Sequence, residues 1–189
     1  MAEIARLTLD GVDADAAEPN VKALLDGTRK SLGFVPNMYT NMANSSGLLD
    51  TYMVGYKHFR AESHLAPAEQ EVVLLTISHE NRCRYCMAAH SMVGEKMSNV
   101  PAAVLSALRA GKILPDARLQ ALSLFTRLMV KGRGNPSPEE LQAFLAAGFS
   151  ERHVLEIILA IAVKTISNYA NHLFHTELDA AFSGYRWDA

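Results

Sequence analysis

Cysteine is scarce in this chain. Only two of the 189 residues are cysteines, too few for the several disulfides that stabilise a small secreted scaffold. Long apolar runs are also missing, because the longest, Ile157 to Val163, is far shorter than the roughly 20 residues that cross a bilayer. The beginning of the chain lacks the basic start and the apolar stretch of a signal peptide. We therefore expect a cytoplasmic protein without a membrane-spanning segment.

Charge of one sign is not concentrated anywhere in the sequence. Charged residues make up 20% of the chain, acids and bases are mixed, and the net charge is −2. No basic block indicates nucleic acid, and no acidic tail indicates disorder. The hydrophobic content of 49% is an ordinary value for a soluble globular protein. These values predict one folded unit that binds neither nucleic acid nor a membrane.

Strand patterns are weak, and helical periodicity dominates. Leu48, Tyr52, Tyr56 and Phe59, for example, recur close to the 3.6-residue period of a helix. Proline, glycine and serine mark the ends of such segments. The sequence predicts helices over residues 21–32, 36–44, 48–62, 68–79, 83–96, 101–111, 116–130, 138–148 and 150–182. We predict an all-α fold, with residues 1–18 as a partly extended N-terminal arm and residues 19–189 as a single helical domain.

The most informative segment runs from Glu71 to His90, EVVLLTISHENRCRYCMAAH. It holds both cysteines, spaced as Cys83-x-x-Cys86 at the predicted start of a helix. Glu71 lies twelve residues before Cys83, and His90 lies four residues after Cys86. In a reducing compartment, two cysteines at this spacing indicate catalysis or metal binding rather than a structural disulfide.

The two cysteines have the spacing that a peroxidatic and resolving pair requires. A helix N-terminus and the adjacent Arg82 and Arg84 lower a thiol pKa from ~8.5 towards neutrality. A thiolate that attacks a peroxide becomes a sulfenic acid, and the second cysteine condenses with it to a disulfide. The helix end favours Cys83 as the thiol of lower pKa, whereas the nearby His90 favours Cys86.

Three further side chains are candidates for moving the proton. His90 lies about one helical turn after Cys86 on the same face, where an imidazole takes the thiol proton and returns it to the leaving hydroxide. Glu71, on the preceding helix, would orient His90 or relay the proton if the two helices pack as a hairpin. Tyr85 would donate a hydrogen bond to the peroxide or extend the relay. His172 and His175 either line the same pocket or, as we favour, are ordinary polar residues of a helix face.

The same residues leave other functions open. A Cys-x-x-Cys pair is half of many zinc sites, and His79 or His90 would complete a Cys2His2 or Cys2His set in a non-enzymatic helical module. A thiol–disulfide oxidoreductase or redox sensor would exchange the dithiol with a protein partner, without substantial peroxidase turnover. Lactone or decarboxylation chemistry would use Glu71 and His90 without the cysteines.

The cysteine segment has a counterpart further along the chain. Residues 69–90 align with residues 151–172 without a gap, at an offset of 82 residues. Apolar positions coincide through the first half, but Cys83 faces Thr165 and Cys86 faces Asn168. We interpret this as a degenerate duplication of a helical hairpin in which only the first copy carries sulfur chemistry; chance similarity of two apolar helices is the alternative.

The order Glu71, Cys83, Cys86, His90 resembles the active-site pattern of the AhpD-like alkylhydroperoxidases of the carboxymuconolactone decarboxylase superfamily. The segments Gly33-Phe34-Val35-Pro36-Asn37 and Asn168-Tyr169-Ala170-Asn171-His172 resemble its peroxidase-related branch. The resemblance covers roughly residues 30–182. It implies an all-helical fold built from a repeated unit and a homo-oligomer. It further implies that Cys86 attacks, that Cys83 resolves, and that Glu71 and His90 relay the proton.

One position departs from the family pattern. Well-studied alkylhydroperoxidases carry a histidine just before the second cysteine, where this chain has Tyr85, a poor base at neutral pH because a tyrosine pKa is ~10. The decarboxylases of the superfamily lack the Cys-x-x-Cys pair, which argues against decarboxylation. The sequence thus predicts a thiol-dependent peroxidase that reduces hydroperoxides without a bound cofactor or metal. The resemblance implies a lipoylated or thioredoxin-like dithiol protein as its reductant.

Overall fold

The computed structural model describes residues 5–188 as nine α-helices and one short 3₁₀-helix, with no strand in this range. The elements are α1 (Pro19–Leu32), α2 (Asn37–Met42), α3 (Ser46–Glu62), α4 (Pro67–Glu80), α5 (Arg84–Lys96), α6 (Ala102–Arg109), α7 (Ala117–Lys131), α8 (Pro138–Ala146), α9 (Glu151–Phe174) and η1 (Ala180–Tyr185). The predicted all-α fold is confirmed, and the bounds of the first eight helices agree with the sequence periodicity to within a few residues.

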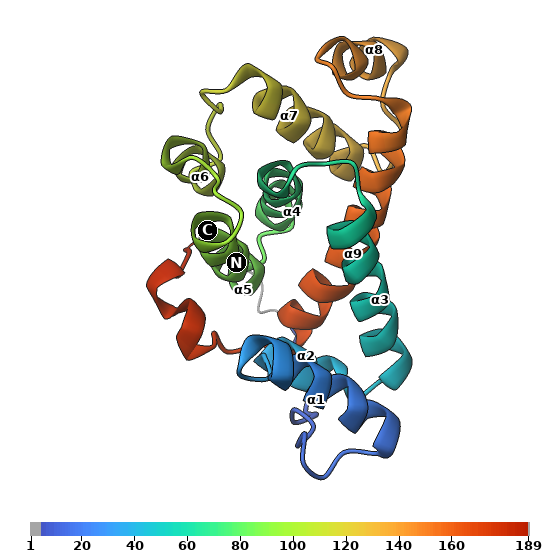
Figure 1. Ribbon diagram of the computed structural model, residues 1–189, viewed down its shortest axis with the longest axis vertical. Coiled ribbons are helices and arrows are strands. Elements are labelled where there is room, and N and C mark those ends of the chain that lie inside the picture. Colours follow the sequence, from blue (N-terminus) through green and yellow to red (C-terminus); the bar gives the residue numbers. More distant parts are fainter. Residues whose placement is uncertain (1–4, 189) are drawn as a thin grey trace.

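Helix α4 is the centre of the fold. Every residue from Gln70 to Ser78 is buried, because α5, α6, α7 and α9 pack around the helix (Figure 1). The apolar side chains Val72 to Leu75 and Ile77 face these neighbours and belong to the main hydrophobic core. Glu71 lies on this same helix and is completely buried. A carboxylate held in such surroundings requires charged or hydrogen-bonding partners.

A tight reversal joins α4 to α5 and places the cysteines. Arg82 has a left-handed backbone (φ 54°), and its N–H bonds back to the carbonyl of His79. The N–H of Cys83 then bonds to the carbonyl of Ser78, which completes the pattern of a Schellman motif. Cys83 is the N-cap of α5, so Cys86 lies in the first turn of that helix. The predicted helix–break–helix arrangement therefore brings both sulfurs to one helix start beside α4.

The last helix is shorter than predicted. The sequence indicates helix to about residue 182, but α9 ends at Phe174 and His175 has a left-handed backbone (φ 49°). The chain then turns back, and η1 packs against α5. Asp179 holds this C-terminal segment against α5 and α2, since its carboxylate accepts hydrogen bonds from Tyr85 and from the backbone N–H of Asn37. These contacts are remote in sequence, so helical periodicity does not report them.

The prediction of a second helical hairpin is also wrong. Residues 151–172 lie within the single continuous helix α9, whereas residues 69–90 form α4, a turn and the start of α5. No residue of the second stretch, 151–172, has the left-handed backbone that opens the turn at Arg82, so the helix continues through it. The correspondence between the two stretches is therefore one of apolar spacing.

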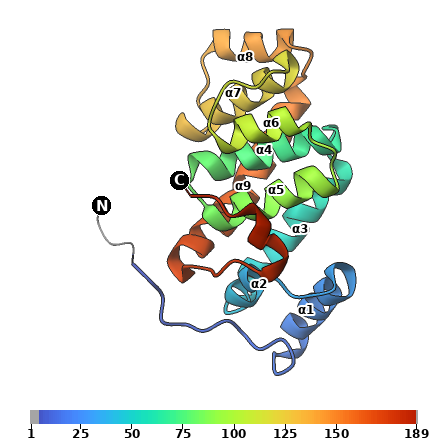
Figure 2. The same cartoon turned by 90° about the vertical axis from the view of Figure 1, so that its left-hand side faces the viewer.

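The N-terminal arm contains no helix between residues 5 and 18; the first four residues of the predicted arm lie outside the described part of the chain. The arm runs from α1 towards the end of α9, with α1 and α8 at opposite ends of the molecule (Figure 2). Two of its contacts are backbone hydrogen bonds, from Leu7 to the carbonyl of Leu173 and from Val12 to that of Thr40, each 2.9 Å. The arm thus joins α2 to α9.

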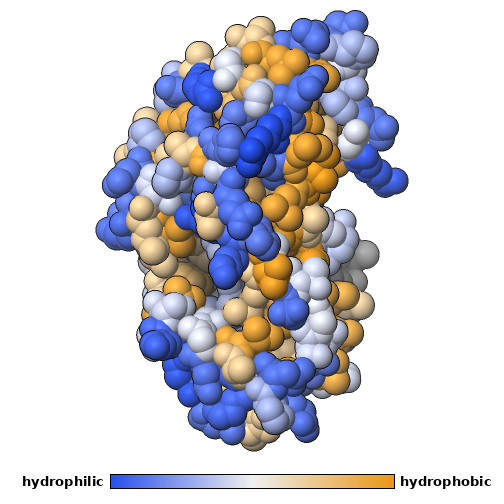
Figure 3. All heavy atoms as spheres, turned by 45° about the vertical axis from the view of Figure 1, so that its right-hand side comes forward, coloured by the Kyte–Doolittle hydropathy of each residue, from blue (hydrophilic) through white to orange (hydrophobic). Residues whose placement is uncertain are grey.

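Large apolar side chains remain exposed on α3 and α9. Leu155 is 66% exposed, and Val54 and Ile158 are each 47% exposed. Figure 3 shows hydrophobic surface gathered on the side of the molecule where α3 and α9 lie. Within residues 5–188, α9 is also the one helix long and apolar enough to cross a membrane, but a core helix passes the same test and 39% of that window is buried.

Candidate functional site

Both cysteines are free and buried at the start of α5. The side-chain amide of Asn171, on α9, donates towards both sulfurs, at 3.4 Å from Cys86 Sγ and 3.8 Å from Cys83 Sγ. The Cys86 thiol lies 3.9 Å from the hydroxyl of Ser167, one turn earlier on α9. Helices α5 and α9 together hold the dithiol. Asn171 lies in the segment that carries the family resemblance, whereas Ser167 is a residue that the sequence does not single out.

A cavity of about 510 Å³ opens onto one of the two sulfurs. Cys86 lines it, together with His90 and Tyr85, whereas Cys83 and Glu71 do not line the cavity. Most of the lining is aromatic or apolar. The other lining side chains of α1–α3, the α1–α2 loop, α5 and η1 are Leu32, Phe34, Pro36, Met38, Tyr39, Tyr52, Met53, Tyr56, Ala89, Met92, Val93, Met97 and Phe182, with the polar Thr28, Ser31 and Lys57. A substrate that enters this cavity meets Cys86 before Cys83.

Lys164 lines the same cavity from α9. Its side chain is completely buried, and within residues 5–188 its Nζ atom has no hydrogen-bond partner. Sequence reasoning missed this residue. The available signal is a lysine that directly follows the apolar run Ile157 to Val163 in the middle of a core helix, where an ammonium group needs a counter-charge.

The two thiols differ in acidity. Burial opposes ionisation of Cys86, but the hydrogen bond from the Cys83 thiol and the positive charge of Lys164, aided by His90 when protonated, hold the pKa of Cys86 well below its usual value. The hydrogen bond that Cys83 gives to Cys86, together with burial, raises the pKa of Cys83 well above its usual value. Of the two thiols, Cys86 is therefore the one that ionises more readily. The N-cap position by itself favours Cys83, but the hydrogen bond from Cys83 and the charge of Lys164 favour ionisation of Cys86.

Glu71 and His90 meet as the hairpin model predicts. His90 Nδ1 lies 2.9 Å from Glu71 Oε2, and the other carboxylate oxygen accepts a hydrogen bond from Arg60 Nη1 at 2.5 Å. A carboxylate only accepts, so Nδ1 carries the proton and Nε2 keeps a lone pair. Burial and the charge of Lys164 lower the pKa of His90 in spite of Glu71. The imidazole is thus neutral at pH 7, and Arg60 compensates the carboxylate charge behind it.

The Tyr85 hydroxyl is occupied. It donates a 2.5 Å hydrogen bond to Asp179 Oδ2, and burial together with that carboxylate raises the tyrosine pKa. The ring packs edge-on against Phe182 at 5.9 Å between centroids. Tyr85 therefore presents its ring to the cavity and its hydroxyl to the C-terminal segment. Tyr85 thus ties the segment carrying Phe182 to α5.

The remaining histidine candidates lie away from the thiols. Neither His172 nor His175 lines the Cys86 cavity, and His79 packs at a tilted angle against Trp187, with 5.4 Å between the ring centroids. In the part of the chain that the structure describes, no three His, Cys, Asp or Glu side chains gather as metal ligands do. The Cys2His2 zinc arrangement considered from the sequence therefore does not form here.

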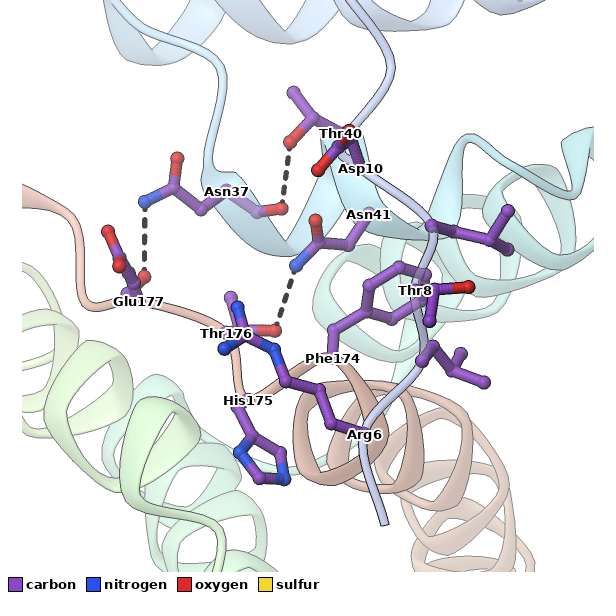
Figure 4. Close-up of a pocket in the computed structure, with 13 residues that line it drawn as sticks. Arg6, Thr8, Asp10, Asn37, Thr40, Asn41, Phe174, His175, Thr176 and Glu177 are labelled. Carbon is purple, nitrogen blue, oxygen red and sulfur yellow. Dashed lines mark hydrogen bonds between the residues drawn. The ribbon is translucent and has the colours of Figure 1, made fainter.

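A second cavity, about 610 Å³, lies between the N-terminal arm and the end of α9 (Figure 4). Its wall includes Asn41, which donates to Thr176 Oγ1 at 3.0 Å, and Asn37, which donates to the carbonyl of Glu177 at 3.1 Å. His175 lies here. No cysteine lines this cavity, so it is separate from the dithiol.

Comparisons with known proteins agree with this fold. Residues 48–125, which include Glu71, both cysteines and His90, match the model of the carboxymuconolactone decarboxylase family. No curated protein matches the chain. A solved structure from Ralstonia eutropha JMP134, described as an alkylhydroperoxidase AhpD core and peroxidase-related protein, is similar over 96% of each chain, with 18% identity and a TM-score of 0.80.

Two further neighbours have the same overall structure. A peroxidase-related protein from Silicibacter sp. TM1040 is 21% identical, with a TM-score of 0.79 over 97% of this chain and 96% of its own. A cysteine-to-alanine variant of the debrominase Bmp8, solved with 2,3,4-tribromopyrrole, is 17% identical, with a TM-score of 0.74 over 97% of each chain. Residues 48–125 of this protein are therefore a carboxymuconolactone decarboxylase family domain, and the chain around them has the AhpD-like fold.

Proposed function

We propose that this protein is a thiol-dependent peroxidase that reduces hydroperoxides through a Cys83–Cys86 dithiol/disulfide cycle. The single observation that carries the proposal is the placement of Cys86. Its sulfur faces an apolar cavity, its pKa is lowered, and a second thiol hydrogen-bonds to it from behind. A thiolate with a resolving thiol in contact is what peroxide reduction by sulfur requires.

The first step is attack of the Cys86 thiolate on the terminal oxygen of the hydroperoxide. An S–O bond forms, the O–O bond breaks, and the leaving alkoxide takes a proton to become the alcohol. Because Cys86 starts as a thiolate and His90 is neutral, that proton comes from water. His90 lines the cavity and its Nδ1–H is held by Glu71, so Nε2 is the atom that takes the proton and passes it to the alkoxide. When Cys86 starts as a thiol, the imidazole takes the thiol proton and hands it to the alkoxide.

The second step is attack of Cys83 on the Cys86 sulfenic acid. The S–S bond forms, the S–OH bond breaks, and the hydroxide leaves with the proton of the Cys83 thiol as water. The cycle therefore consumes one hydroperoxide and yields one alcohol, one water and one disulfide. Cys83 lies three residues before Cys86 at the same helix start, so it condenses with the sulfenic acid before a second oxidant reaches it.

The disulfide must then be reduced through the same cavity. Cys83 is fully buried and does not line the cavity, so an external thiolate reaches the pair at Cys86. A slender dithiol arm, such as a lipoyl group carried by a protein, fits a cavity of about 510 Å³ better than the surface of a folded thioredoxin does. We therefore propose a lipoylated protein as the reductant.

Stopped-flow oxidation of the reduced protein tests the proposed function. Mixing with cumene hydroperoxide should consume two thiols per hydroperoxide and form the intramolecular disulfide. Cys86→Ser should abolish consumption, whereas Cys83→Ser should stop at a sulfenic acid that a dimedone probe captures. Asp179→Asn, outside the proposed chemistry, serves as the matched control. Thiol loss no faster than that of free cysteine would rule out the proposal.

A second candidate is reductive debromination of an aromatic ring. The aromatic lining of the cavity and the structural likeness to Bmp8 favour it. The Cys86 thiolate would take bromine from carbon, a proton would replace it on the ring, and Cys83 would displace bromide to form the disulfide. Release of one bromide from 2,3,4-tribromopyrrole for each disulfide formed would support this candidate. Hydroperoxide turnover without bromide release would exclude debromination and support the peroxidase function.

A further inference from the structure

Lys164 is a buried cation whose function the dithiol chemistry leaves unassigned. Its side chain has no exposed surface, and among the described residues no atom hydrogen-bonds to its ammonium group. Burial of an unpaired ammonium costs several kcal/mol, so a folded protein keeps one only where an anion meets it. A neighbouring group must therefore carry the negative charge that balances the Lys164 ammonium.

The carboxylates near the site are already engaged. Glu71 pairs with Arg60 and with His90, and Asp179 accepts from Tyr85 and Asn37. Among the described residues, no Asp or Glu lines the cavity that Lys164 faces. An acidic side chain is therefore not the counter-charge of Lys164.

The other titratable groups around Cys86 come from every helix packed against it. They are Tyr39 of α2, Tyr52 and Tyr56 of α3, Cys83, Tyr85 and His90 of α5 and, behind His90, Glu71 of α4 with Arg60 of α3. Burial raises the pKa of each of the four tyrosines, to about 12 for Tyr39, so all four hydroxyls are neutral at pH 7. Cys86 is the group left to carry the negative charge.

We propose that the Lys164 ammonium is the counter-ion of the Cys86 thiolate and that this pair, rather than His90, ionises the attacking sulfur. Lys164 is thus a positioning residue that acts through Cys86. The two functions of the site are divided between helices. Helix α9 supplies the charge that keeps the sulfur ionised, α5 supplies the imidazole that handles the proton, and α4 supplies the carboxylate that holds the imidazole. His90, being neutral, accepts a proton from water at Nε2 and passes it to the leaving group.

Lys164 also affects the equilibrium between the dithiol and the disulfide. Oxidation to the disulfide removes the negative charge and leaves Lys164 without its partner, so Lys164 stabilises the reduced form relative to the oxidised form. A dithiol whose thiolate is stabilised in this way makes an oxidising disulfide. Loss of Lys164 should therefore increase the fraction of disulfide at a given ratio of reduced to oxidised glutathione.

The test measures the ionisation of Cys86 without any peroxide. The proposal rests on the peroxidase function only in its choice of Cys86 as the attacking atom, and the two fail separately. Alkylation by iodoacetamide is followed from pH 4 to pH 10, and peptide mass spectrometry distinguishes alkylation of Cys86 from that of Cys83. In Lys164→Met, alkylation of Cys86 at pH 6.5 should fall by about tenfold or more, since each pKa unit changes the thiolate fraction tenfold below the pKa.

Matched variants separate charge from structure. Lys164→Arg keeps the charge and should keep the wild-type pH profile, whereas Lys164→Gln keeps length and polarity and should behave as Lys164→Met. Lys57→Met removes the exposed lysine of the same cavity, whose charge water screens, and should leave the profile unchanged. His90→Gln should lose hydroperoxide turnover while Cys86 still reacts below neutral pH.

The outcomes that overturn the proposal are specific. A wild-type alkylation profile in folded Lys164→Met or Lys164→Gln, checked by circular dichroism, rejects it. A profile that moves to alkaline pH in His90→Gln and stays unchanged in the Lys164 variants also rejects it, and assigns the ionisation to His90. If both neutral variants fail to fold, the profile of Lys164→Arg decides: loss of low-pH reactivity there, with the charge kept, contradicts the proposal.

Discussion

Replacement of Tyr85 by phenylalanine distinguishes a structural role of this residue from a catalytic one. The tyrosine is 5% exposed and Asp179 is 8% exposed, and the hydrogen bond between them is 2.5 Å long. A hydrogen bond to a charged group contributes about 1.5–3 kcal/mol. After the substitution, Asp179 keeps only the backbone N–H of Asn37, so we expect the free energy of unfolding to fall by about 2 kcal/mol.

The assay is urea denaturation followed by circular dichroism, together with the melting temperature. For a chain of this size, ~2 kcal/mol corresponds to a decrease in Tm of about 4–8 °C. Hydroperoxide turnover at 25 °C should persist, because the hydroxyl points at Asp179 and the ring remains in the cavity wall. Loss of a general acid or base typically lowers the rate by about 10²- to 10⁴-fold, and we expect no loss of that size.

Two further results complete this test. The double variant Tyr85→Phe/Asp179→Asn removes the buried charge together with its donor, so its destabilisation should be smaller than the sum of the two single variants. An unchanged urea midpoint in Tyr85→Phe, combined with a turnover at least ~10²-fold lower, would refute the reasoning and place the hydroxyl in the chemistry.

Three further predictions follow from the site. Arg60→Met leaves the buried Glu71 without its cation; breaking such a pair costs about 3–5 kcal/mol, and the partial exposure of Arg60 lowers the expected loss to ~2–3 kcal/mol, so an unchanged urea midpoint would contradict it. Asn171→Leu removes the amide that donates to both sulfurs, and Cys86 alkylation at pH 6.5 should fall by about tenfold, while an unaltered rate would show that the amide does not stabilise the thiolate. In the wild type, Cys86 should react with iodoacetamide below neutral pH, because its pKa is lowered, and lose reactivity only as the pH falls through that value, whereas Cys83 should react only at alkaline pH; equal labelling of both peptides at pH 6.5 would be the contrary result.

Local sequence was sufficient to predict most of the helices and the order of the candidate residues. Apolar periodicity placed the first eight helices, and the spacing of Glu71, Cys83, Cys86 and His90 indicated one site. The break between α4 and α5 was predicted although Arg82, the residue that reverses the chain, is not a glycine. These features depend on neighbours within one or two turns, which the sequence states directly.

Tertiary structure decided how the site is charged. Lys164 lies 78 residues from Cys86, and Asp179 lies 94 residues from Tyr85. Nothing within a helical turn of Tyr85 indicates that its hydroxyl is occupied, and the helix start alone points to the wrong cysteine as the thiolate. Whether a buried group is ionised depends on the charges that other helices bring to it. The sequence by itself therefore determined the helices and the dithiol. The packing of α9 against α5 decided which charge meets Cys86, and the packing of the C-terminal segment decided what the Tyr85 hydroxyl contacts.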